Sequence, residues 1–404
     1  MDRRGVITPR MRRCAAILSV GSLALAGAAP VAAAVHSAET PSMSATTTPT
    51  VAVLIQEAMA GLDHPWDVTF TPDNTMLVTE RDRERITARF PNGTEEVLAE
   101  NTPGVWHGGE TGLMGIVVDP GFKRNSAFYT CHGSDAGRGL DIRVVRWKVN
   151  DAFTTATQVK TIVKGMPVST GRHGGCRLRF APDGALYIAT GDAAIGTNPQ
   201  DLSSLGGKVL RVDPDTGEAW PGNPFAGTSD PQTRLVYTFG HRNVQGLAYR
   251  NAADADKGMW SVEHGPDRDD EVNQLVVGGN AGWNPVPGYD ESVPMTDLSL
   301  GDNVFEARWS SGTPTLATSG ATWLTNDRWG TWKGRLAVAA LNDTSLQLMR
   351  FSAAGRLLSQ TDIPDLDDNF GRLRTAQTGP QGALYVTTDN GDGNDVVLKV
   401  TPRE

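Results

Sequence analysis

A short polar cluster around a histidine is the first place in this sequence where chemistry could occur. Residues 172–178 read Arg-His-Gly-Gly-Cys-Arg-Leu, so His173 stands beside glycines that let backbone and ligand approach closely. Histidine is the side chain best suited to move protons near neutral pH. His173 is therefore a candidate general base, and a hydrogen-bonded loop histidine is the structural alternative.

Two further clusters carry permanent positive charge. In residues 239–246, Arg242 and Asn243 place a cation beside an amide, which suits an anionic or quinoid oxygen. In Gly-Arg-Leu-Arg at 371–374, alternate residues of a strand face the same side, so Arg372 and Arg374 could enter one channel. Two adjacent cations repel unless an anion lies between them, which favours a multiply charged ligand. The alternatives are an arginine that pairs a loop carboxylate and an exposed basic edge strand.

The fourth cluster, residues 263–271, reads Glu-His-Gly-Pro-Asp-Arg-Asp-Asp-Glu and is dense in oxygen donors. Gly265 and Pro266 could direct carbonyl oxygens at a hard cation, and the carboxylates could serve calcium. The spacing is not that of an EF-hand, and a solvated acidic turn is the alternative. The sequence shows no phosphate-binding glycine loop, no serine-nucleophile motif and no zinc-type spacing of Cys and His.

Internal similarity indicates the elements that must position these clusters. Residues 181–192 match residues 379–390, and residues 71–80 are a looser copy. Each copy has an apolar strand, a Pro/Asp/Gly turn and a second strand rich in β-branched residues, which is the pattern of a β-hairpin. Six such units begin near Trp66, Leu113, Leu178, Leu247, Ala321 and Thr375. No segment sustains a helical apolar period, so we predict an all-β, six-bladed β-propeller of four-stranded antiparallel blades. Its loops converge on one end of a channel, which explains why the clusters are scattered along the chain.

The first 50 of the 404 residues differ from the rest. Residues 1–34 have the basic, apolar and small-residue order of a secretory signal, and the paired arginines also fit twin-arginine export. Residues 35–50 are rich in Ser and Thr and are predicted to be a disordered tether, followed by the propeller at 51–404. We therefore expect a secreted protein with no membrane span. A formal net charge of −9 argues against nucleic acid as a partner.

Two cysteines remain after removal of the signal. Cys131 and Cys176 form an even pair in an oxidising compartment, in loops that we expect to lead into adjacent blades. We predict that they form a disulfide. The alternative is two separate buried thiols.

The four clusters, in this order on a propeller, resemble the soluble glucose and aldose sugar dehydrogenases that use pyrroloquinoline quinone (PQQ). The resemblance covers about residues 51–402, starting at Gly-Leu-Asp-His-Pro-Trp (61–66). Its other specific segments are residues 173–177, Asp-Leu-Ser-Ser-Leu-Gly-Gly-Lys-Val-Leu-Arg at 201–211, Gly-His-Arg-Asn at 240–243, 263–266, and Gly-Gly-Asn-Ala-Gly-Trp at 278–283.

The resemblance implies a role for each candidate residue. His173 matches the catalytic base, and Arg242 the group that stabilises charge on the reactive carbonyl oxygen. The residues that match the family's cofactor contacts are Arg242, Asn243, Arg372, Arg374 and Asn342. Gly265 and Pro266 match the residues whose backbone carbonyls bind the calcium that also holds PQQ. Glu271 matches a ligand of a second, structural calcium. Glu110 and Arg172 take substrate positions where glucose dehydrogenase has Gln and Asp, and Asn342 replaces a cofactor-binding Lys.

The implied activity is oxidation of an aldose at C1 to the lactone, with hydride transfer to the quinone and an external electron acceptor. A secreted propeller that binds a carbohydrate or a partner without turnover is one alternative. A calcium-dependent lactonase is another, and it would require a carboxylate cage at the channel centre, which the sequence does not locate.

Overall fold

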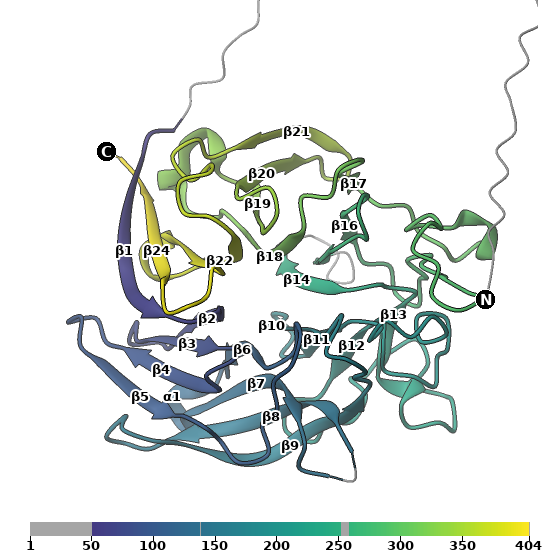
Figure 1. The fold of residues 1–404 in the computed structure, drawn as a ribbon, viewed down its shortest axis with the longest axis horizontal. Helices are drawn as coiled ribbons and strands as arrows, with labels where there is room; N and C mark the ends of the chain where they lie inside the picture. Colours follow the sequence, from purple (N-terminus) through teal and green to yellow (C-terminus); the bar gives the residue numbers. More distant parts are fainter. Residues whose placement is uncertain (1–50, 138, 252–257, 404) are drawn as a thin grey trace, which may run out of the picture. The chain divides into compact units, whose positions relative to one another are not determined.

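The computed structural model describes residues 51–137, 139–251 and 258–403, which form six four-stranded antiparallel sheets (Figure 1). The sheets are the blades of a six-bladed β-propeller, as predicted. The expected signal segment (1–34) and tether (35–50) lie outside the described residues. No helix in the described part of the chain is long and apolar enough to cross a membrane.

Each of the first five blades uses four consecutive strands. Blade 1 contains β2 (Pro65–Phe70), β3 (Met76–Glu80), β4 (Arg85–Arg89) and β5 (Glu95–Ala99). Blade 2 contains β6 (Leu113–Val118), β7 (Ala127–Ser134), β8 (Asp141–Val149) and β9 (Ala156–Met166). Blade 3 contains β10 (Gly175–Phe180), β11 (Leu186–Thr190), β12 (Lys208–Val212) and β13 (Val236–Phe239).

The remaining blades follow the same plan, with one difference at the closure. Blade 4 contains β14 (Val244–Tyr249), β15 (Met259–Glu263), β16 (Glu271–Gln274) and β17 (Trp309–Ser310). Blade 5 contains β18 (Thr318–Trp323), β19 (Leu336–Ala340), β20 (Leu346–Phe351) and β21 (Leu357–Asp362). Blade 6 combines β1 (Val53–Leu62) with β22 (Leu373–Thr378), β23 (Leu384–Thr388) and β24 (Asp395–Pro402). The helical segments are α1 (Phe122–Asn125), η1 (Thr233–Leu235), η3 (Leu298–Leu300), η4 (Asp327–Trp332) and η5 (Pro380–Gly382).

Both ends of the described chain build blade 6. Strand β1 pairs with β24 in antiparallel register, with Val53 opposite Pro402 (Figure 1). The innermost strands β2, β6, β10, β14, β18 and β22 each contact the next in a closed ring. Closure leaves no inner sheet edge exposed, which is how a propeller accommodates many short strands.

The repeats found in the sequence are the hairpins between the first and second strands of the blades. In blade 3, the turn from β10 to β11 is closed by the N–H of Ala181, which donates to the carbonyl of Ala185 at 3.0 Å. Gly184 takes φ 95° in this turn, where an L side chain would be strained. The six predicted unit starts all fall in the inner strands, so the blade assignment from sequence is confirmed.

A buried ion pair joins the inner strands at the centre of the ring. Arg177 of β10 contacts Asp67 of β2 at 2.5 Å, and it donates to the hydroxyl of Thr375 in β22 at 2.9 Å. Its Nε donates to the backbone carbonyl of Gln245 in β14 at 2.8 Å. The guanidinium carbon lies 4.1 Å from the ring centre of Trp66. One arginine thus connects four of the six inner strands.

The predicted disulfide between Cys131 and Cys176 is confirmed, with a Cα–Cα distance of 5.4 Å. The cysteines lie within β7 and β10 rather than in the loops where the sequence placed them. The bond therefore joins the second strand of blade 2 directly to the inner strand of blade 3.

Candidate functional site

Three of the polar clusters lie where the chain enters the inner strands of blades 3, 4 and 6, and the fourth, residues 263–271, connects β15 to β16 in blade 4. His173 precedes β10 and takes φ 53°, a left-handed conformation. The packing is so close that a Cβ on Gly191 would lie 1.8 Å from the carbonyl oxygen of His173. Glycine at this position therefore allows the loop after β11 to lie directly against the histidine.

The imidazole of His173 is held through one ring nitrogen. Its Nδ1 lies 2.8 Å from Oδ1 of Asp192 and 3.0 Å from the hydroxyl of Tyr289. Oδ2 of Asp192 accepts from Tyr289 at 2.7 Å and from the indole of Trp283 at 2.9 Å. His173 and Asp192 are both buried. Because a carboxylate only accepts hydrogen bonds, we assign the proton to Nδ1, which leaves the lone pair on Nε2.

Arg172 lies on the Nε2 side of the same ring. Its Nη2 is 3.4 Å from Nε2 of His173 and 3.1 Å from Oε1 of Glu291. The side chain of Arg172 is 45% exposed, so Nε2 of His173 is next to a cation that reaches the surface.

Glu110 and Asn243 contact the backbone of the histidine loop. Oε2 of Glu110 accepts from the N–H of His173 and from the side-chain amide of Asn243, each at 3.2 Å. The side-chain carbonyl of Asn243 accepts from the N–H of Gly175 at 3.1 Å. These bonds join the loops that enter blades 2, 3 and 4.

Arg242 connects the 263–266 segment with the long loop before β17. Its Nη1 donates to the carbonyls of His264 at 2.8 Å and Gly265 at 2.9 Å. Its Nη2 donates to Glu291 at 2.6 Å. Arg242 therefore does pair a loop carboxylate, as the structural alternative expected.

A cavity of about 450 Å³ opens next to Arg242. It is lined by Arg172, Arg242, Pro266, Asp267, Arg268, Glu291 and Ser292. Pro266 thus faces the cavity, whereas the carbonyl of its neighbour Gly265 accepts from Arg242.

Arg372 and Arg374 share one carboxylate. Oδ2 of Asp389 lies 2.7 Å from Nη2 of Arg374 and 3.8 Å from Nε of Arg372. Burial alone would raise the pKa of Asp389, but the Arg374 charge and the hydrogen bonds from His64 and Arg374 hold it far below its usual range. The anion expected between the two arginines is therefore supplied, at least in part, by the chain itself. Arg374 is buried and also donates to Gln245 at 3.0 Å, whereas Arg372 is exposed.

Glu271 lies within β16, directly opposite Glu263 of β15. Its oxygens accept from the hydroxyl of Thr296 at 2.8 Å and the amide of Asn273 at 3.2 Å. Burial and then the charge of Glu263 raise the pKa of Glu271 to about 8. A carboxylate in this position requires a proton or a cation to compensate its charge.

Asn342 follows β19 in blade 5, and its side chain is exposed. Its amide donates to the carbonyl of Thr315 at 3.3 Å. We find no hydrogen bond from Asn342 to another predicted site residue in the described part of the chain. It is the predicted cofactor contact with the weakest structural connection to the others.

Several buried nitrogen atoms in this region have no hydrogen-bond partner among the described residues. They are Nε of Arg242, Nε of Arg374 and Nδ1 of His264. Burial and the charge of Arg242 lower the pKa of His264 to about 3, so this imidazole is neutral at pH 7. The guanidinium charges of Arg242 and Arg374 fit a ligand with several anionic or carbonyl oxygens, which are the groups that PQQ carries.

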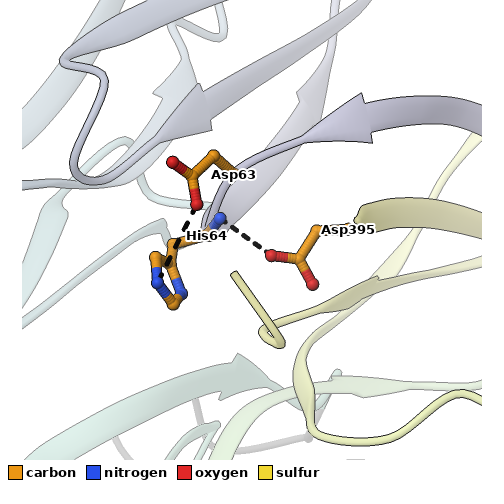
Figure 2. Close-up of side chains that lie close together, drawn as sticks. All are labelled: Asp63, His64 and Asp395. Atoms are coloured by element: carbon orange, nitrogen blue, oxygen red, sulfur yellow. Dashed lines mark hydrogen bonds and ion pairs between the residues drawn. The ribbon is translucent and has the colours of Figure 1, made fainter. Parts of the chain in front are cut away.

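Asp63, His64 and Asp395 form a group that is close enough to hold a metal ion (Figure 2). Asp395 is already saturated, because its oxygens accept from the N–H groups of His64, Asn390 and Gly391 and from a hydroxyl of β23. Nδ1 of His64 lies 2.9 Å from Asp389. We therefore interpret this group as part of the closure between blades 6 and 1.

The sequence did not identify three residues that organise the site: Asp192, Tyr289 and Glu291. Asp192 ends one of the repeats, where Gly-Asp follows the second strand, and this repeated position was the available signal. Tyr289 and Glu291 lie in a long segment between β16 and β17 that matches no repeat, so only the folded structure reveals their contacts.

Comparison with known proteins identifies a family and several relatives that this chain resembles. A family model described as glucose/sorbosone dehydrogenase matches residues 62–399. Aldose sugar dehydrogenase YliI of Escherichia coli (strain K12) is 33% identical over 353 residues, which are 85% of this chain and 91% of that protein. Quinoprotein glucose dehydrogenase B of Acinetobacter calcoaceticus is 28% identical over 261 residues, 58% of this chain and 52% of that protein. The PQQ-bound aldose sugar dehydrogenase of Streptomyces coelicolor has a TM-score of 0.71 at 29% identity, covering 87% of this chain and 100% of that one.

Proposed function

This chain belongs to the glucose/sorbosone dehydrogenase family, and we propose that it oxidises aldose sugars at C1 with PQQ and calcium. The observation that carries the proposal is the position of His173. Its Nδ1 is hydrogen-bonded to the buried carboxylate of Asp192. Its Nε2 lies beside the half-exposed Arg172, which lines the cavity.

His173 would accept the proton of the C1 hydroxyl at Nε2. Asp192 fixes the tautomer in which Nε2 carries no proton, and its charge stabilises the imidazolium once the proton has arrived. Tyr289 and Trp283 hold Asp192 in place through the hydrogen bonds at 2.7 and 2.9 Å. When bound, PQQ would supply the hydride acceptor and calcium a Lewis acid, so that oxidation at C1 would give a lactone and an external acceptor would regenerate the cofactor.

Arg242, Asn243, Arg372 and Arg374 would hold the cofactor. Both arginines carry a permanent positive charge for an anionic ligand, and the buried Nε of each has no hydrogen-bond partner among the described residues. The positive charge of Arg242 would also stabilise negative charge that develops on the reacting oxygen. Asn342 would contribute least, because it is exposed and its amide already bonds to Thr315.

Calcium would use the carbonyl oxygens of Gly265 and Pro266. Backbone carbonyls are suitable ligands for this hard cation. The Gly265 carbonyl accepts from Arg242 at 2.9 Å, so this arginine must share or release that oxygen when the ion binds. Glu271 is proposed for a second, structural ion, because its buried carboxylate faces Glu263.

Reconstitution tests this function. PQQ and calcium are added to the cofactor-free protein, and the absorbance spectrum is recorded before and after addition of an aldose. We expect a bound-quinone spectrum that changes to the reduced form. Failure to bind PQQ in the presence of calcium would instead favour the non-catalytic propeller, whose support is the set of substitutions at Glu110, Arg172 and Asn342.

We also propose that the chain is exported. The support is the basic and apolar order of residues 1–34, together with a disulfide that suits an oxidising compartment. Sequencing the amino terminus of the mature protein tests this, and an intact Met1 in the natural host would contradict it.

A further inference from the structure

We propose that the natural substrate is an aldose that carries a carboxylate, such as a hexuronic acid, and that Arg172 and Arg242 bind this carboxylate. The inference rests on the proposed function and names its substrate class. Arg172 is the starting point, because its guanidinium lies 3.4 Å from the ring nitrogen that would receive the C1 proton. A sugar held at that nitrogen must lie against this cation.

The chain already places one carboxylate between the two arginines. Oε1 of Glu291 lies 3.1 Å from Nη2 of Arg172 and 2.6 Å from Nη2 of Arg242. The side chain of Glu291 is 36% exposed, so it can rotate toward solvent when another anion arrives. Its position marks where the carboxylate of a substrate would bind.

The loop that carries Glu291 is held independently of this side chain. Nη2 of Arg268 donates to the backbone carbonyls of Ser292 at 2.7 Å and Val293 at 3.2 Å. Exchange of Glu291 for a substrate carboxylate therefore requires a rotation of one side chain and leaves the cavity wall in place.

Asp267, which lines the cavity, and Glu110, which contacts the histidine loop, have partners other than Arg172. Asp267 is 83% exposed and pairs with Arg268. Glu110 accepts from the backbone of His173 and from Asn243. A neutral aldose that displaced Glu291 would leave two arginines without an anion, whereas an acidic aldose would replace the lost pair, and this difference favours the acid.

A binding experiment tests the inference without turnover. Methyl glucuronoside and methyl glucoside have C1 blocked and differ in the carboxylate. By calorimetry on the cofactor-free protein, we expect the glucuronoside to bind roughly tenfold more tightly, as for one charge-assisted pair in a half-exposed site. Arg172→Gln should remove this preference, while Arg356→Gln, which removes an exposed arginine from the turn before β21, should retain it. Equal affinity for the two glycosides in the unmodified protein would overturn the inference.

Turnover of the reconstituted enzyme gives the second test. We expect kcat/KM to be about tenfold higher for glucuronate than for glucose, and Glu291→Gln to raise it further for glucuronate by removing the internal competitor. Oxidation of glucose at least as efficient as that of glucuronate would refute the acidic substrate but retain the dehydrogenase. If neither sugar is oxidised although PQQ binds, the proposed function fails, and glycoside binding still decides the inference.

Discussion

The carboxylate of Asp192 accepts a hydrogen bond from Nδ1 of His173 at 2.8 Å, with both side chains buried. This pair fixes which ring nitrogen can accept a proton. Asp192→Asn offers an amide that can donate to Nδ1 and so favours the wrong tautomer. We predict that kcat falls by roughly 10²-fold or more while PQQ still binds. Steady-state kinetics with a PQQ titration measure both, and Asp183→Asn, at a turn in the same blade, is the matched control.

The central ion pair between Asp67 and Arg177 predicts a large effect on stability. The Asp67→Ala variant leaves the charge of Arg177 buried without its partner, which should cost about 3–5 kcal/mol of unfolding free energy. The control is Asp215→Ala, which breaks the surface pair with Arg146, where Asp215 is 70% exposed. That loss should stay below about 1 kcal/mol. Denaturant unfolding measures both values. Similar losses of unfolding free energy in the two variants would contradict the role of Arg177 in joining the inner strands.

The disulfide between Cys131 and Cys176 closes a long loop, with 45 residues of sequence separation. We predict that the double variant Cys131→Ala, Cys176→Ala loses about 2–4 kcal/mol of unfolding free energy. Alkylation of the denatured protein without reductant, followed by mass spectrometry, should label neither cysteine in the unmodified chain. Labelling of both would contradict the bond.

His64 predicts a pH dependence of stability. The hydrogen bond to Asp389 is the main cause that raises the pKa of His64 above its ordinary value. The stabilisation is therefore fully present below the pKa of the unfolded chain and is lost as pH rises through the raised folded pKa. Asn tolerates the left-handed φ of 48° at this position, so His64→Asn is the suitable variant. The stability difference between the two proteins should shrink from pH 6 to pH 9, and a difference that grows would reverse the assignment.

The sequence predicted the fold better than it predicted the site. Hairpin turns such as residues 181–185 use local chemistry, which repeats along the chain and identifies the blades. The contacts of Glu291 with Arg172 and Arg242 depend on a loop without repeats, and they arise only when blades 3 and 4 are adjacent. Likewise, the anion between Arg372 and Arg374 was expected from charge repulsion alone. That argument could not distinguish a ligand from Asp389 of the chain's own blade 6.

The most direct test of the central claim is reduction of bound PQQ by sugar in the His173→Gln variant. The cofactor's charge would be held by Arg242, Arg372 and Arg374, so we predict that the variant binds PQQ with unchanged affinity. Its rate of quinone reduction, followed by absorbance in a single turnover, should fall by roughly 10²–10⁴-fold, because Gln cannot accept the C1 proton. A folded variant that binds PQQ fully and reduces it at the unmodified rate would contradict the role of His173 as the general base.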